Sequence, residues 1–193
     1  MKFTNRQLEI IQAATKLVGN KGIQNLTTKN LATEMGFSEA ALYRHFKNKN
    51  VIISSILEYY KDDFKGVMMN ILQTENLGIE KLEHIIEFLF SHFVKNPAII
   101  MIIFAETSFQ NEKMLSEQVL SILNQKKIVF EQVILKGQED GSIRKDINKE
   151  QLSTIFMGSM RFTVLRWRLS KMGFDLEKEG VVLWKALHKI LKQ

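Results

Sequence analysis

Ten residues between positions 27 and 49 have side chains suited to contacts with nucleic acid. Hydroxyls, positive charges and the N–H groups at the start of a helix can hold phosphate oxygens. Small and polar side chains on one helix can reach base edges in the major groove of duplex DNA. The chemistry predicted for this segment is DNA binding, and the candidate residues are Thr27, Thr28, Lys29, Ser38, Glu39, Ala40, Tyr43, Arg44, His45 and Lys49.

Two short helices must position these side chains. Thr27 is a typical N-cap for a helix that ends at Met35, before Gly36. Ser38 is a typical N-cap for the next helix, which is expected to run through Phe46. Two short helices joined by the turn 36–38 fit a helix-turn-helix, in which the first helix braces the second.

The apolar residues of this segment fall on one side of the two helices. Leu42 and Phe46 lie one turn apart and are expected to pack inward, with Leu31, Met35 and the apolar stripe of a preceding helix over residues 5–18. The outward face then carries small and polar side chains that could read bases: Glu39, Ala40, Tyr43 and Arg44. Around that face, phosphate contacts are expected from Thr27, Thr28, Lys29, Tyr43, His45 and Lys49.

The positive charge of the chain is concentrated in the same region. Residues 1–50 contain eight Lys and Arg against three Glu, whereas the other 143 residues are nearly neutral within a total of +6. Such a distribution favours attraction to a polyanion. The alternative is an ordinary solvated basic surface, and charge alone does not separate the two.

The remainder of the chain is expected to be helical as well. Apolar residues recur at helical spacing almost throughout, glycine and proline are scarce, and no strand is predicted. The predicted fold is all-α with about nine helices: a three-helix DNA-binding domain over residues 1–50 and a helical body over 51–193 for effector binding and dimerisation. The later helices are expected at 51–73, 78–95, 97–109, 112–140, 149–172 and 176–191.

The stretch LATEMGFSEAALYRHFKNK, residues 31–49, resembles the DNA-binding region of the tetracycline-repressor (TetR/AcrR) family. The run Leu-Tyr-Arg-His-Phe followed by Lys49 is the most specific part, and the match extends back through residues 10–14 and Gly22. A weaker similarity covers residues 137–144, where the family often turns into its penultimate helix. Two departures are Asn50, at a place that is commonly acidic, and Glu39, which adds a negative charge to the reading face.

The resemblance implies a homodimer on a palindromic DNA site, usually a repressor that a small molecule releases. A cytoplasmic location is expected separately, because the sequence has no apolar run long enough to span a membrane and does not start with an apolar signal region. In the family the last two helices form the dimer interface. Here that interface would use Phe156, Met157, Gly158, Met160, Val164, Trp167, Val181, Trp184, Leu187 and Leu191. The alternative is that these residues fill the core of the body itself.

An apolar effector pocket is the second expectation for the body. Phenylalanine and methionine are abundant between the long linking helix and the dimer helices, which favours an uncharged or lipophilic effector. The candidate lining residues are Phe88, Phe93, Met101, Phe104, Phe109, Phe130 and Phe162. Each of them could equally be an ordinary core residue.

Other functions find little support in the sequence. The chain has no cysteine, and His84, Glu87 and His92 do not reproduce a known metal-binding spacing, so neither a metal nor another cofactor is expected. No catalytic motif is present, which argues against the first rival, an enzyme. The longest apolar run, 98–105, is too short to span a membrane, and no membrane partner is expected. A protein that organises DNA without responding to an effector remains the second rival.

Overall fold

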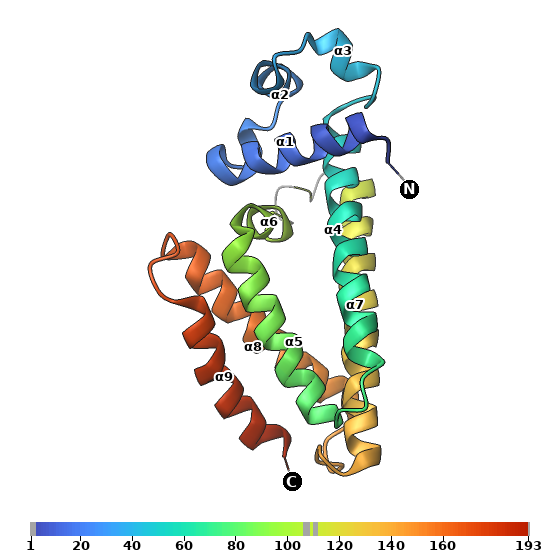
Figure 1. Cartoon of the computed structure of the whole chain (residues 1–193), viewed down its shortest axis with the longest axis vertical. Coiled ribbons are helices and arrows are strands. Elements are labelled where there is room, and N and C mark those ends of the chain that lie inside the picture. The colour runs from blue at the N-terminus through green and yellow to red at the C-terminus, as the bar shows by residue number, and fades with distance from the viewer. Residues whose placement is uncertain (1–2, 106–108, 110–111, 193) are drawn as a thin grey trace. The chain divides into compact units, whose positions relative to one another are not determined.

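The computed structural model describes residues 3–105, 109 and 112–192 (Figure 1). Within these residues all regular structure is helical, so the predicted all-α fold is confirmed. No single described helix is long and apolar enough to cross a membrane, although α5 and α6 pass that test when counted together. The elements in chain order are α1 (Asn5–Lys21), the 3-10 turn η1 (Ile23–Asn25), α2 (Thr28–Met35), α3 (Glu39–Tyr43), α4 (Lys49–Leu72), α5 (Gly78–Lys95), α6 (Pro97–Ile103), α7 (Lys113–Asp140), α8 (Lys149–Leu169) and α9 (Leu176–Leu191).

The chain forms two compact units. The first unit comprises Met1–Asp63 with Asn96–Leu120, and the second comprises Phe64–Lys95 with Ser121–Gln193. The helices α4 and α7 each contribute their first part to the first unit and their remainder to the second. The functional division at residue 50 is a separate matter and stays a prediction.

Side-chain caps fix where the first helices begin. Thr4 and Gln7 form a reciprocal capping box at the start of α1. The hydroxyl of Thr27 accepts a hydrogen bond from the backbone N–H of Asn30 at 3.0 Å, and Ser38 caps α3 in the same way. The two caps expected from the sequence are therefore confirmed, and such a cap contributes about 1 kcal/mol to helix stability.

The core of the first unit joins α1 to the helices that follow. The side chains of Ile10, Ala14 and Val18 on α1 have no exposed surface. At the other side of α1, Gly19 lies so close to Ala98 of α6 that a β-carbon at position 19 would sit 2.6 Å from Cβ of Ala98. The helix α1 is therefore the element around which the first unit packs.

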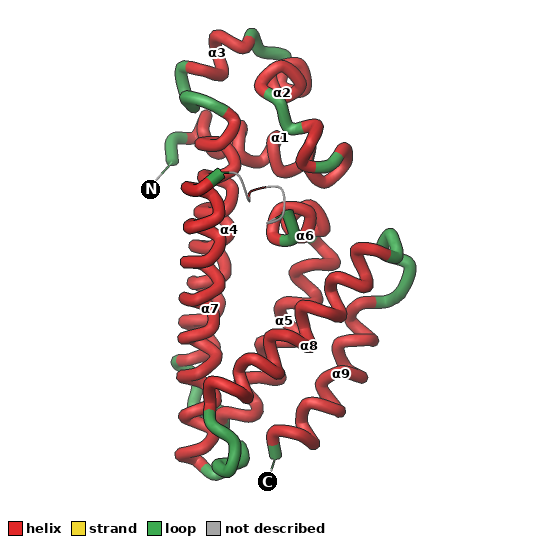
Figure 2. The backbone as a smooth tube through the Cα atoms, turned by 180° about the vertical axis from the view of Figure 1, so that it is seen from behind, coloured by secondary structure: helices red, strands yellow, loops and turns green. Residues whose placement is uncertain are grey.

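The second unit is built around α5, with α9 packed along it and α8 packed on α9 (Figure 2). The carboxylate of Asp140, the last residue of α7, accepts hydrogen bonds at 2.8 Å from the backbone N–H groups of Gly78 and Ser142. This contact ties the start of α5 to the turn that leads into α8. The turn itself passes through Gly141, whose φ of 81° favours glycine.

Several helix boundaries differ from the sequence expectation. The helix α3 stops at Tyr43 instead of Phe46, because the chain turns there to bury Phe46 while Gln7 Nε2 donates to the carbonyl oxygen of His45 at 3.3 Å. The helix α4 begins at Lys49 because Asn48 caps it by accepting from the N–H of Val51.

Two further differences lie later in the chain. The helix α6 ends at Ile103, well before Phe109. The helix α8 ends at Leu169 because Lys171 and Met172 adopt positive φ angles, and the indole N–H of Trp167 donates to the carbonyl oxygen of Phe174 across the resulting turn.

The crossing of α5 and α7 predicts an asymmetry between two glycines. A β-carbon at Gly78 would lie 2.3 Å from backbone atoms of Gly137, so Gly78→Ala is expected to lower the free energy of unfolding by about 1–3 kcal/mol. Gly66 on α4 has open space at the same position, so Gly66→Ala should raise stability by up to about 1 kcal/mol. Urea denaturation of the two variants measures both changes, and equal effects would refute the proposed close crossing.

Candidate DNA-binding surface

Three buried side chains hold the helix-turn-helix on the first unit. Leu31 on α2 and Leu42 on α3 have no exposed surface, and Phe46 just after α3 is 3% exposed. The inward packing expected from the sequence is therefore confirmed for these residues. Because α3 is a single short helix, this packing also decides which side chains face outward: Glu39, Ala40 and Tyr43 on α3, and Arg44 just after it.

Side chains from α2 and α3 form a hydrogen-bonded cluster on that outward surface. The hydroxyl of Thr28 donates to Glu39 Oε2 at 2.6 Å, and the hydroxyl of Tyr43 donates to Thr28 Oγ1 at 3.3 Å. Tyr43 is nevertheless 49% exposed. Thr28, Glu39 and Tyr43 are thus brought together, and the carboxylate of Glu39 is held at the edge of α3 instead of moving freely in solvent.

The other candidates surround this cluster. Lys29 and Arg44 are exposed, while His45 and Lys49 are partly buried. Within the part of the chain that the structure describes, no ion pair engages Lys29, Arg44 or Lys49. The exposed residues Thr27 and Ser38 use their hydroxyls as caps, so they order the helix starts and their backbone N–H groups.

Two further contacts involve residues that lie near α2 and α3 in the first unit. The guanidinium of Arg6 lies over the ring of Phe37 in the turn, 5.0 Å from its centroid. The amide of Asn50, which departs from the usual acidic residue, donates to Glu112 Oε2 at 2.7 Å. Asn50 therefore contacts the residue just before α7, and the cap of α4 is supplied by Asn48.

The residues expected at a dimer interface divide into two groups. Seven of them are buried within the chain: Phe156, Met160, Val164, Trp167, Trp184, Leu187 and Leu191. Gly158 and Val181 are exposed, and Met157 is partly buried.

A second set of large apolar side chains on α8 and α9 faces outward and was not predicted as an interface: Ile155, Phe162, Leu169, Val182 and Ile190. The seven-residue spacing of Ile155, Phe162 and Leu169 was the signal in the sequence.

The seven candidates for an effector pocket lie in both units. Met101, Phe104 and Phe109 belong to the first unit, and Phe88, Phe93, Phe130 and Phe162 belong to the second. Phe130 packs against Phe156 with ring centroids 5.4 Å apart, and Phe88 packs against His92 at 5.4 Å. Phe162 is 62% exposed. Whether these residues touch an effector stays a prediction.

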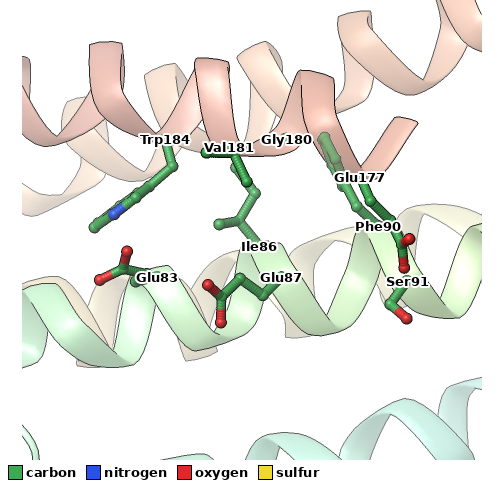
Figure 3. Close-up of a pocket in the computed structure, with 9 residues that line it drawn as sticks. All are labelled: Glu83, Ile86, Glu87, Phe90, Ser91, Glu177, Gly180, Val181 and Trp184. Carbon is green, nitrogen blue, oxygen red and sulfur yellow. The ribbon is translucent and has the colours of Figure 1, made fainter. Parts of the chain in front are cut away.

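A groove of about 250 Å³ lies between α5 and α9 of the second unit (Figure 3). Its floor is apolar, with Phe90 against the backbone of Gly180 and with Trp184 facing Glu83 across the space. Glu87 and Glu177 add further carboxylates to its lining. Sequence reasoning missed this groove because nothing in a local pattern predicts that α9 pairs with α5.

Comparison with known proteins supplies the family. Residues 10–56 match the family described as "Bacterial regulatory proteins, tetR family", and residues 79–175 match "Tetracyclin repressor-like, C-terminal domain". The chain is 31% identical over 185 residues to the nucleoid occlusion factor SlmA of Aliivibrio fischeri, covering 95% of this chain and 94% of that protein. It is 30% identical to SlmA of Photobacterium profundum, covering 96% and 95%.

Solved structures agree with this assignment at the level of the fold. The regulator FadR from Bacillus subtilis, in complex with stearoyl-CoA, superposes with a TM-score of 0.83 at 20% identity, covering 93% of this chain and 96% of that one. The ketosteroid regulator KstR2 of Mycobacterium tuberculosis gives 0.80 at 16% identity, covering 100% and 97%. With both family segments matched and relatives alike over nearly their whole length, the chain belongs to the TetR family of DNA-binding regulators.

Proposed function

We propose that this regulator binds a palindromic operator as a homodimer, inserts α3 into the major groove, and leaves the DNA when a small lipophilic molecule binds its body. The observation that carries the proposal is the outward face of α3, which buried Leu42 and Phe46 orient and which exposed cations flank. Repression is the expected consequence, since a regulator bound at a promoter blocks access to it.

The two kinds of contact have separate residues. Lys29 and Lys49 supply positive charge for phosphates, which gives affinity and position. Arg44 lies on the outward face with the candidate base-reading residues. Glu39 and Ala40 at the start of α3 are placed to read base edges, and a carboxylate accepts a hydrogen bond from the N4 amine of cytosine. The hydroxyl of Thr28 fixes the Glu39 carboxylate in one position. A carboxylate fixed in this way favours a cytosine in each half-site.

Dimerisation supplies the second reading head. The outward apolar side chains of α8 and α9 form a surface that a second copy can bury, with Phe162 62% and Leu169 69% exposed in the single chain. A two-fold axis through such a surface places the same residues against each other. Two linked heads on one palindrome bind far more tightly than either alone.

The effector class rests on the body and on the neighbours. The FadR neighbour was solved with stearoyl-CoA, and KstR2 is named a ketosteroid regulator. Both names point to molecules with large apolar parts, which suits a helical body rich in phenylalanine and methionine. A lipophilic molecule is therefore the effector we propose here.

A second candidate function is nucleoid occlusion, because the SlmA relatives from Aliivibrio fischeri and Photobacterium profundum carry that name and match this chain over nearly their full length. Such a protein would use the same DNA-binding residues at many chromosomal sites. Genome-wide binding measured with and without candidate lipids separates the two functions. A few promoter sites released by ligand support regulation, and many ligand-indifferent sites support nucleoid occlusion.

Removing one phosphate contact is expected to weaken binding to every DNA sequence. Lys49→Ala should lower affinity for specific and random duplexes alike, and should reduce the slope of log affinity against log salt by about one. Lys145→Ala, an exposed lysine in the turn between α7 and α8, is the matched control and should leave both quantities unchanged. Fluorescence anisotropy over a salt series measures them, and an unchanged slope for Lys49→Ala would remove this residue from the interface.

Removing the support of Glu39 is expected to alter selectivity. Thr28→Val deletes the hydroxyl between Glu39 and Tyr43, so it should relax base preference at the same operator position that Glu39→Gln affects. Thr33→Val is the control, because its hydroxyl donates to the carbonyl oxygen of Lys29 within α2. Selection from a randomised duplex library reads out the preference. Effects of Thr28→Val and Glu39→Gln at different positions would contradict the shared role.

A charge on the outward face of α8 is expected to separate the dimer. Phe162→Glu places a carboxylate where two copies would bury apolar surface, so it should yield monomers and lower operator affinity by at least about tenfold. Leu120→Glu on α7 alters a side chain of similar exposure, 58%, and should leave the dimer intact. Sedimentation velocity gives the masses of both variants, and a dimeric Phe162→Glu protein would refute this interface.

A further inference from the structure

One partly buried lysine of the second unit, Lys126, has no acidic partner among the residues that the structure describes. Lys126 lies on α7, partly buried, with its Nζ atom 4.6 Å from the ring centroid of Phe64 on α4. Its neighbour Lys127 pairs with Glu131 at 3.1 Å, whereas no carboxylate among the described residues lies within ion-pair distance of Lys126. The two adjacent lysines therefore have different surroundings although the sequence makes them look alike.

The charge of Lys126 is electrostatically costly to hold in this place. Burial, and then the positive charge of Arg161 on α8, lower the pKa of Lys126 to about 8. At neutral pH most molecules still carry the proton. The folded protein thus keeps a partly desolvated ammonium beside a second cation, with the face of Phe64 as its described contact.

A lysine with only a structural role would carry an unfavourable desolvation free energy at this position. A methionine or leucine has a similar volume and would avoid the desolvation cost, and replacing buried charges by apolar residues is often neutral or stabilising. An anion brought by a ligand changes that balance, because it supplies the missing opposite charge in surroundings of low dielectric. The charge of Lys126 should therefore be less costly when an anionic ligand is bound than in the free protein.

We propose that Lys126 binds the anionic head group of the effector, so that the effector is an amphipathic acid with an apolar chain and a carboxylate or phosphate. This inference rests on the effector-binding function proposed above and narrows it. It replaces the uncharged molecule that the abundance of phenylalanine and methionine favoured. Phe64 would then keep the ammonium directed toward the ligand and line the start of the apolar part.

Matched ligands test the head group. Dodecanoate, monododecyl phosphate and dodecanol share one apolar chain, and isothermal titration calorimetry at pH 7 on the full-length protein compares their affinities. At least one of the two anions is expected to bind about tenfold or more tightly than the alcohol, and the stronger of them identifies the head group. Equal binding of all three ligands would overturn the assignment of Lys126.

Variants test the residue. Lys126→Met should lose the preference for the anion while still binding dodecanol, Lys126→Arg should retain it, and Lys127→Met is the control that should behave as the wild type. A preference that persists in Lys126→Met would overturn the proposal.

A second experiment adds the same three ligands to the complex of the wild-type protein with operator DNA. Release by dodecanol as readily as by the anions overturns only this inference, whereas no release by any of them also counts against the lipophilic-effector function.

Discussion

The burial of Leu42 and Phe46 beneath a five-residue helix is the contact on which the DNA-binding surface depends. An isolated helix of one and a half turns is unstable in water, because the cost of fixing its first residues is never recovered. Packing on α1, the Ser38 cap and the bond from Gln7 to the carbonyl of His45 together compensate for that cost. The reading face is therefore a product of the whole first unit, and α3 has no orientation of its own.

The same dependence explains what could be predicted from sequence. The caps at Thr27 and Ser38, the glycine that ends α2 and the apolar positions of α2 and α3 are local features, and each was predicted correctly. The end of α3 was not, since it depends on the contact of His45 with a residue 38 positions earlier. The cluster of Thr28, Glu39 and Tyr43 was missed for the same reason, because it joins two helices.

The second unit shows where periodicity stops being informative. The helix α8 is apolar on two sides, with Phe156 and Trp167 buried and Phe162 and Leu169 exposed. The apolar periodicity therefore identified the helix. It could not say which of the two apolar sides is buried within the chain. Lys126 is a related case, since beside Lys127 it looks like part of a solvated surface. Only the approach of α4 and α8 gives the two lysines different environments.

Positive charge is exposed to solvent in one part of the molecule and desolvated in the other. In the helix-turn-helix, exposed cations attract a polyanion from a distance, and salt screens that attraction. At Lys126 one desolvated cation would recognise a single head group, where screening is weak. If an acid bound there weakens operator binding by some factor, thermodynamic linkage requires that operator DNA weaken binding of the acid by the same factor. The affinity for the acid should therefore be lower in the DNA complex than in the free protein, which is the reciprocal signature that joins the two sites.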